Sequence, residues 1–205
     1  GNSYGGLYVG INALVTRCGV YNNGLNAPPV DPPWTDGIQV GDYSTITDCK
    51  AMYNRGAGIH AYNHSKVTGC TATESWEANG IWAEDYCTIR DCTAAKNASD
   101  GIRVGNNCRV VGNTCGQNGL KKPGPNEAGI LVNGANNLIE DNIVSGNDNG
   151  IRVTSPGNLI VRNAASKNTN TFDYMVGGGN YMGPIITPSS GEITNSNPWT
   201  NFRFF

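Results

Sequence analysis

The sequence predicts an all-β solenoid in which each coil supplies three short strands to three parallel sheets. Two observations lead there. First, the 205 residues include 28 Gly and, counted along the chain, 28 Asn. These are turn-forming residues and poor helix formers. Second, a pattern of Gly, apolar residue, any residue and small apolar residue recurs seven times, with Gly-to-Gly steps of 31, 21, 22, 21, 28 and 21 residues. The seven copies begin at Gly6, Gly37, Gly58, Gly80, Gly101, Gly129 and Gly150.

Within each repeat, three short segments carry apolar residues in fixed columns. Alternation over such short segments is typical of strands, and three strands in about 21 residues leave no room for a crossover helix. The first column reads Leu7, Ile38, Ile59, Ile81, Ile102, Ile130 and Ile151. The second reads Val15, Ile46, Val67, Ile89, Val110, Ile139 and Ile160. The third reads Val20, Ala51, Ala72, Ala94, Cys115, Val144 and Ala165.

Stacking each repeat on the previous one satisfies these columns. Each coil then rises by about 4.8 Å, the spacing of neighbouring strands, and seven coils span roughly 30 Å. With these columns the chain resembles a right-handed parallel β-helix, similar to the pectate-lyase-like superfamily and to bacterial β-helix repeat proteins. The resemblance covers about residues 5–168 and supplies the handedness. We therefore expect seven to eight coils, three parallel sheets and a C-terminal cap.

The organisation along the chain follows the repeat. Residues 1–168 are predicted to form the coils, with loop insertions near 24–36 and 119–127 before the first strand of their coils. The period fails after residue 168, so residues 169–205 are expected to form a last partial coil and an aromatic capping tail. The N-terminal coil shows no comparable cap. Homo-oligomeric or end-to-end association is therefore an expectation, because an open coil end exposes strand edges.

Polar columns mark the corners between segments. One column reads Asn23, Asn54, Ser75, Asn97, Asn118, Asn147 and Asn168, and stacked amides there are expected to bond from coil to coil. A second changes from thiol to amide along the stack: Cys18, Cys49, Cys70, Cys92, Asn113, Asn142 and Asn163. The resemblance to a family with Asn ladders implies a structural role for these Asn.

The seven Cys are predicted to be small buried residues, because each falls in a repeat column. A disulfide between Cys87 and Cys108, which lie on adjacent coils, stays open as an alternative. No cofactor is predicted. Ca²⁺ is common among β-helix enzymes of this resemblance, but the GGxGxD repeat is absent and no Asp cluster offers a clear site. The acidic pair Glu84–Asp85 and the Asn147–Asn149 turn are weak candidates.

The candidate site lies on the first strand of each repeat, whose middle residue is expected to face solvent. His60, Tyr62, Trp82, Glu84 and Arg103 would form one patch across three coils. The resemblance implies the same face, because enzymatic relatives carry their substrate groove there. We predict catalytic roles for His60, with Arg103 and Glu84 beside it; His60 would be a general base. Substrate-binding residues are predicted to be Trp34, Gln39, Tyr62, Trp76, Trp82, Lys121 and Lys122.

Structural roles compete with these functions. A single outward His is commonly a solvated surface residue, the Trp side chains could simply cover the sheet, and Glu84 with Arg103 could be an exposed ion pair of small value. Asp36 and Asp100 are interpreted as turn residues about 14 Å apart. That separation exceeds the roughly 6.5–9.5 Å of an inverting glycosidase pair. The sequence also lacks the carboxylate pair of galacturonan hydrolases and the Lys or Arg base with an Asp cluster of pectate lyases.

These observations favour an extracellular or cell-surface bacterial β-helix module, secreted, that is structural or binds a polysaccharide or cell-surface glycan through the first-strand sheet. The alternative is a polysaccharide lyase or epimerase acting on an acidic glycan. A formal net charge of −2 offers no general attraction to nucleic acid. No apolar run approaches the roughly 20 residues of a membrane span.

Overall fold

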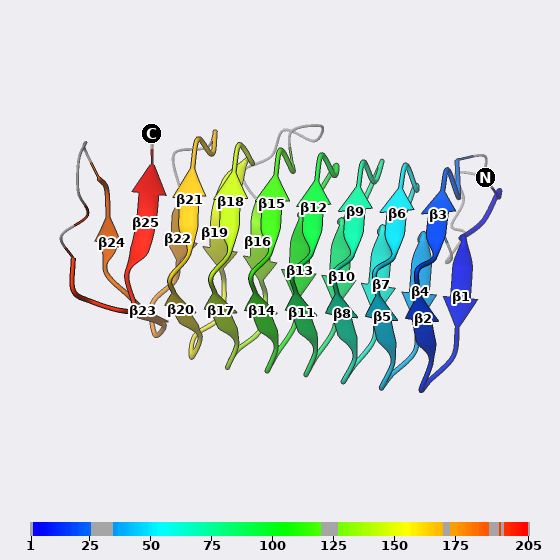
Figure 1. Cartoon of the computed structure of the whole chain (residues 1–205), viewed down its shortest axis with the longest axis horizontal. Coiled ribbons are helices and arrows are strands. Elements are labelled where there is room, and N and C mark those ends of the chain that lie inside the picture. Colours follow the sequence, from blue (N-terminus) through cyan, green and yellow to red (C-terminus); the bar gives the residue numbers. More distant parts are fainter. Residues whose placement is uncertain are drawn as a thin grey trace.

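The computed structural model describes residues 2–25, 35–119, 127–169, 173–188, 193 and 195–204. Within these residues the chain winds through three parallel sheets that run along one axis (Figure 1). Sheet A contains β1 (Leu7–Val9), β4 (Ile38–Val40), β7 (Ile59–Ala61), β10 (Ile81–Ala83), β13 (Ile102–Val104), β16 (Ala128–Val132), β19 (Asn149–Val153) and β22 (Tyr174–Val176).

The other two sheets follow the same coil order. Sheet B contains β2 (Leu14–Thr16), β5 (Thr45–Thr47), β8 (Lys66–Thr68), β11 (Thr88–Arg90), β14 (Arg109–Val111), β17 (Leu138–Glu140), β20 (Leu159–Val161) and β23 (Tyr181–Met182). Sheet C contains β3 (Gly19–Tyr21), β6 (Lys50–Met52), β9 (Thr71–Thr73), β12 (Thr93–Ala95), β15 (Thr114–Gly116), β18 (Ile143–Ser145), β21 (Ala164–Ser166), β24 (Ile185–Ile186) and β25 (Asn201–Phe204).

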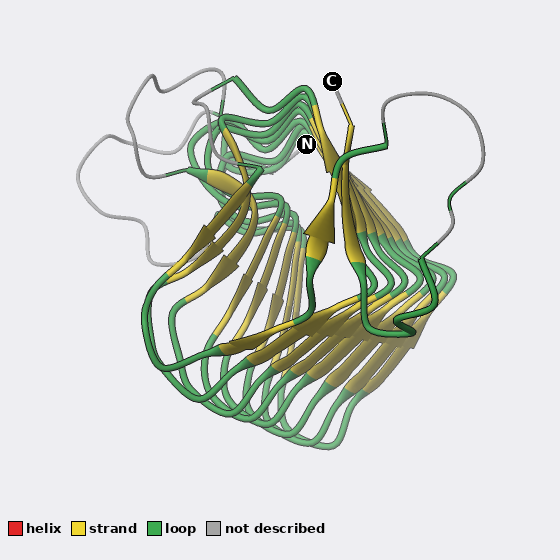
Figure 2. Cartoon of the chain, turned by 90° about the vertical axis from the view of Figure 1, so that its left-hand side faces the viewer, coloured by secondary structure: helices red, strands yellow, loops and turns green. Residues whose placement is uncertain are grey.

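The predicted columns are the register of the sheets. Ile59 pairs with Ile38 on one side and Ile81 on the other, and the same one-repeat offset holds in sheets B and C. Seen along the axis, the three sheets surround the core (Figure 2). The inward Ile residues from Ile38 to Ile151 are fully buried. The prediction of seven to eight coils in three parallel sheets is therefore confirmed, with eight strands in sheet A.

The corners bend through left-handed backbone conformations. Each strand of the regular coils is followed by one residue with positive φ, such as Arg17, His64 or Lys96, at 53°, 58° and 58°. Seventeen of the described residues in this conformation are not Gly. The conformation carries a steric cost for residues with a Cβ atom. Hydrogen bonds between coils, formed at the residue after the bend, offset this cost.

The residue after most bends turns a small polar side chain inward, where it accepts from the preceding coil. Ser75 is an exception, because its buried hydroxyl has no hydrogen-bond partner among the described residues. Asn118 accepts from the backbone N–H and the side-chain amide of Asn97, at 3.1 and 2.9 Å. At the second corner, Cys92 N–H donates to Asn113 at 3.0 Å. At the third, Ser44 N–H donates to the Ser65 hydroxyl at 3.1 Å. All three corners are therefore hydrogen-bonded along the stack, since buried amides need such partners.

The C-terminal strand closes sheet C out of sequence order. β25 lies between β21 and β24, so the last strand of the chain pairs directly with the last regular coil. Asn201 continues the second corner by accepting from Asn163 N–H at 3.0 Å. The Tyr174 hydroxyl donates to the Phe202 carbonyl at 2.9 Å, and Arg203 pairs with Asp173 at 2.8 Å. These contacts tie the tail to the end of the stack.

The seven cysteines, all within the described residues, are free thiols, Cys87 and Cys108 included. Six are buried and Cys18 is half-buried. Within the described residues, no helix is long and apolar enough to cross a membrane.

Candidate functional site on sheet A

His60 occupies the middle of β7, with its side chain on the outer face of sheet A. Gln39 of β4 and Trp82 of β10 are its register partners on either side. We expected this outward column to face solvent, but His60 is 6% exposed and Gln39 is 5% exposed. The side chains of adjacent coils stand about 4.8 Å apart and cover one another. Facing outward on this sheet is therefore not the same as being solvated.

Aromatic stacking covers both faces of the His60 ring. The Trp82 ring lies parallel to it, with centroids 4.2 Å apart and an interplanar angle of 6°. The Tyr62 ring stacks on it at 4.7 Å and 23°, and Gln39 donates to the Tyr62 hydroxyl at 3.3 Å. The Arg103 guanidinium lies 5.2 Å from the Trp82 ring centroid, within the range of a cation–π contact. Together they form one layered row along the axis, here called the aromatic row: Tyr62, His60, Trp82 and Arg103.

Two carboxylates face the edges of the same ring. Asp36 Oδ2 lies 3.1 Å from His60 Nδ1, and Glu84 Oε1 lies 3.5 Å from Nε2. Asp36 is itself oriented, because its Oδ1 accepts from the Ala57 backbone N–H at 2.7 Å. In the Nδ1–H tautomer, a neutral ring donates to Asp36 and directs its Nε2 lone pair at Glu84. A protonated ring donates to both carboxylates.

Arg103 has a second partner on its other side. With its amide oxygen turned toward the guanidinium, Asn133 accepts from Nε at 3.2 Å and from Nη2 at 3.1 Å. Arg103 is thus held between an aromatic ring and an amide. It is not the exposed partner of Glu84 that the sequence left open, because Glu84 lies against His60.

Two hollows adjoin this row toward the N-terminal coils, and Tyr8 lines both. One measures about 190 Å³ and includes Tyr4, Asp36 and Gln39 in its lining. The other measures about 270 Å³ and includes Asp42 and Tyr62. Tyr8 is 66% exposed. Tyr8 and Asp36 were not among the predicted site residues, although Tyr8 belongs to the outward column that marked the site.

The predicted residues divide by position. Trp76 lies in the turn between β9 and β10 and not on a strand of sheet A; its backbone N–H donates to the Asn54 carbonyl at 2.9 Å. Trp34, Lys121 and Lys122 lie outside the described residues. The structure brings six predicted residues together along sheet A, namely Gln39, His60, Tyr62, Trp82, Glu84 and Arg103.

Asp100 is a buried carboxyl beside this face. It is 2% exposed, and burial raises its pKa to about 7. Its Oδ1 accepts from the Ala128 backbone N–H at 2.8 Å. The bond joins adjacent coils at the turn before sheet A, like that between Ala57 and Asp36. Among the described residues, no group of three or more His, Cys, Asp or Glu is arranged to hold a metal ion.

Comparisons with known proteins bear on the fold. The family described as "Right handed beta helix region" matches residues 66–197. Two solved structures share the architecture. The Dettilon tailspike protein has a TM-score of 0.61 and 18% identity, over 85% of this chain and 37% of that one. Pectate lyase Pel9A has a TM-score of 0.62 and 17% identity, over 86% of this chain and 50% of that one. The chain thus spans half or less of either protein. No curated protein sequence matches it.

Proposed function

The chain belongs to the right-handed β-helix family, and we propose that its sheet A binds a polysaccharide strand without cleaving it. The ligand would lie over the hollows beside Tyr8 and along the row from Tyr62 to Arg103. Similar folds include a tailspike and a pectate lyase, the second of which is named for a glycan. That likeness shows the fold alone, and the side chains of sheet A are what support a glycan ligand.

The observation that carries the proposal is the enclosure of His60. A general base needs a ring nitrogen within hydrogen-bond reach of a substrate proton. Here Trp82 and Tyr62 cover both faces of the ring, and Asp36 and Glu84 face both nitrogens. We therefore assign the His60 ring a structural role, in which Tyr62 and Trp82 stack against it. Its side chain orders Tyr62 and Trp82 before a ligand arrives, which lowers the entropic cost of binding.

The hollows beside Tyr8 offer the groups that sugars require. Exposed aromatic rings such as Tyr4 and Tyr8 can pack against the C–H faces of a pyranose and bury apolar area. Polar side chains line the same hollows. The carboxylates of Asp36 and Asp42 can accept hydrogen bonds from sugar hydroxyls, and the Gln39 amide can both donate and accept. Because two carboxylates lie here, a neutral or hydroxyl-rich stretch of glycan fits this end of the sheet better than a uronate.

A matched pair of variants tests this proposal. Tyr8 and Tyr181 are 66% and 71% exposed, but Tyr8 lies on sheet A and Tyr181 lies in β23 of sheet B near the other end of the stack. A glycan array would first identify a ligand for the unaltered protein. We expect Tyr8→Ala to weaken affinity for that glycan about tenfold, the usual cost of losing an exposed anchor. Tyr181→Ala should bind normally. Equal binding by both variants, or no glycan bound at all, would overturn the proposal.

The second candidate function is a lyase or epimerase acting on an acidic glycan. The observation that favours it is the Asp36–His60 bond, which orients an imidazole as Asp does in catalytic triads. Arg103 would then neutralise a uronate carboxylate. A lyase produces an unsaturated sugar with new ultraviolet absorbance, so a screen over pectate, alginate and glycosaminoglycans tests it. Turnover that is lost in His60→Ala would establish this candidate and displace the binding role.

The setting of the protein is part of the proposal. A glycan-binding β-helix would act outside the cell or at its surface, where polysaccharides are found. Homo-oligomeric or end-to-end association of chains belongs to the same proposal, and light scattering tests it. A monodisperse monomer at micromolar concentration would remove the association and leave the binding function intact.

A further inference from the structure

Sheet B carries a hollow of its own, outside the face that holds His60. The outward side chains of three successive strands, β8, β11 and β14, line a hollow of about 350 Å³. We propose that this hollow binds an anionic group, a sulfate ester or a carboxylate, of an acidic glycan. The proposal does not depend on sheet A. The hollow is lined by Lys66, Thr68, Thr88, Arg90, Arg109 and Val111.

The register explains the hollow. Lys66 pairs with Thr88, which pairs in turn with Arg109, so a short side chain lies between two long cations. In the neighbouring row, Arg90 lies between Thr68 and Val111. Lys66 and Arg109 stand two coils apart, or about 9.6 Å at the backbone. Their flexible side chains can converge over Thr88 on a ligand no larger than one charged sugar.

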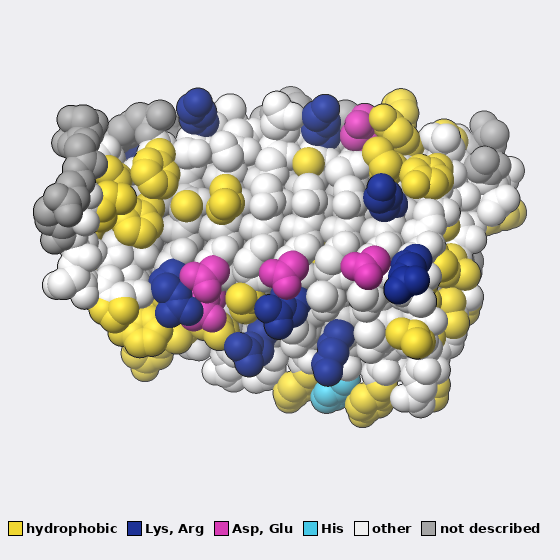
Figure 3. Space-filling model, in the orientation of Figure 1, with side chains coloured by type: hydrophobic (Ala, Val, Ile, Leu, Met, Phe, Trp, Pro, Cys, Tyr) yellow, Lys and Arg dark blue, Asp and Glu magenta, His cyan; other side chains and the backbone are white. Residues whose placement is uncertain are grey.

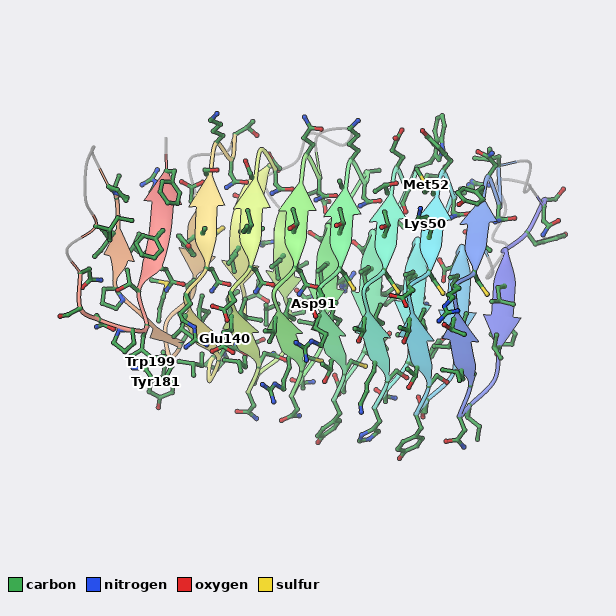
Figure 4. All side chains as sticks on the ribbon, in the orientation of Figure 1. Lys50, Met52, Asp91, Glu140, Tyr181 and Trp199 are labelled. Carbon is green, nitrogen blue, oxygen red and sulfur yellow. The ribbon has the colours of Figure 1, made fainter. Side chains whose placement is uncertain are left out.

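The charge of the hollow is largely uncompensated. Among the described residues, neither Lys66 nor Arg109 makes an ion pair, whereas Arg90 contacts Asp91 at 3.0 Å. Figure 3 shows Lys and Arg gathered over sheet B, below a row of Asp and Glu. Asp91 marks that row in Figure 4, at the bend between sheets B and C. The hollow is therefore locally cationic and is bordered on one side by Asp and Glu side chains.

The lining favours a glycan over nucleic acid. Among the described residues, no aromatic ring lines the hollow, whereas sequence-tolerant binding of single strands relies on stacked aromatic platforms. The Thr68 and Thr88 hydroxyls can donate to the oxygens of a sulfate ester or a carboxylate, or bond to sugar hydroxyls. The guanidinium groups of the two Arg residues match the spacing of the oxygens in such an anion.

Three probes of different charge test the site. We expect the unaltered protein to bind dextran sulfate or polygalacturonate, measured by calorimetry in low salt, and to bind neutral dextran more weakly at this site. Lys66→Gln and Arg109→Gln should each weaken the affinity for the acidic polymer about three- to fivefold, the size of effect expected for an exposed ion pair. The double variant should lose about tenfold or more. Raising salt should weaken binding in the unaltered protein.

Lys50→Gln is the matched control. Lys50 is an exposed cation on β6 of sheet C, so its loss changes the net charge equally but leaves the hollow intact (Figure 4). It should bind like the unaltered protein, and so should Trp82→Ala on sheet A. Equal loss in Lys50→Gln would show a net-charge effect, and loss in Trp82→Ala would place the ligand on sheet A. Single-stranded DNA bound more tightly than either polymer would also overturn the proposal.

Discussion

The His60 ring is bonded to Asp36 through Nδ1 at 3.1 Å, although the two residues belong to different coils and lie 24 positions apart. Asp36 comes immediately before the Gly of its own coil, and His60 lies in the middle of β7, the sheet A strand of the next coil. The pairing arises because stacking places the turn of one coil beside the strand of the next. One carboxylate thus joins its coil to the next through Ala57 and orients the central ring of sheet A.

This pairing predicts the tautomer of His60. In the neutral ring the proton should lie on Nδ1, where Asp36 accepts it. In Asp36→Asn, the new amide oxygen can keep the Ala57 bond while its NH₂ group faces the ring, so the proton should move to Nε2 and face Glu84. Two-dimensional ¹⁵N–¹H spectra of the imidazole distinguish the two forms. Glu84→Gln is the control and should keep the Nδ1–H form. An Nε2–H tautomer in the unaltered protein would contradict the geometry.

Asp100 predicts how stability depends on pH. Burial raises its pKa from the ordinary 3.8 to about 7, Glu127 adds to the shift, and the Ala128 N–H, Arg103 and Arg152 oppose it. Between about pH 4 and 7 the folded chain holds a proton that the unfolded chain has released. Stability contributed by this group is therefore complete below pH 4 and falls as pH rises toward 7, by up to about 1.4 kcal/mol per pH unit.

Asp100→Asn should abolish this slope and raise stability at pH 7.5. The amide can still accept from Ala128, and Asn79 and Asn149 already occupy the equivalent position in other coils. Denaturant unfolding at pH 4.5 and 7.5 measures the effect. Thr114→Ala, an uncharged change on an exposed strand position, should retain the slope of the unaltered protein. An unchanged slope in Asp100→Asn would mean that Asp100 is ionised in the folded state.

The corner bonds predict a large cost for Asn118→Ala. That change removes the acceptor for the Asn97 backbone N–H and side-chain amide and leaves both buried. An unsatisfied buried donor costs about 1–3 kcal/mol, so we expect a loss of about 2–5 kcal/mol in the free energy of unfolding. Thr114→Ala, on the same coil, should cost less than about 1 kcal/mol. Similar losses in the two variants would show that the corner bonds contribute little.

The thiols predict a simple accessibility pattern. Burial raises the pKa of Cys115 and of Cys49, so both are protonated and shielded from a thiol reagent. In the native protein at pH 8 a disulfide reagent should label only Cys18, which is half-buried. All seven Cys should react after unfolding without reductant. Five reactive thiols under those conditions would instead indicate one disulfide, with Cys87 and Cys108 the first pair to examine.

The repeat made most of the fold predictable. Apolar columns one repeat apart became register partners, because parallel stacking leaves no other way to bury Ile59 between Ile38 and Ile81. The insertion of β25 between β21 and β24 was not predictable. Its pairing joins Phe202 to Ala164, far apart in sequence, and the tail lacks the Gly-led pattern of the coils.

The site was predictable in position but not in detail. The outward column placed Gln39, His60, Trp82 and Arg103 on one face, as found. The burial of His60 was missed, because it depends on the orientation of rings from neighbouring coils. Asp36 was interpreted only as a turn residue. Its second oxygen finds His60 only once the coils are stacked, and no single-repeat pattern encodes that contact.

The central claim is that the N-terminal half of sheet A is a glycan-binding face. Backbone and side-chain NMR shifts, followed while the glycan selected on the array is added, test it most directly. We expect the largest changes to cluster on Tyr8, Gln39, Tyr62 and Trp82, with Tyr181 and Trp199 unmoved at the other end of the stack (Figure 4). Changes that cluster at Tyr181 and Trp199, with sheet A unmoved, would contradict it.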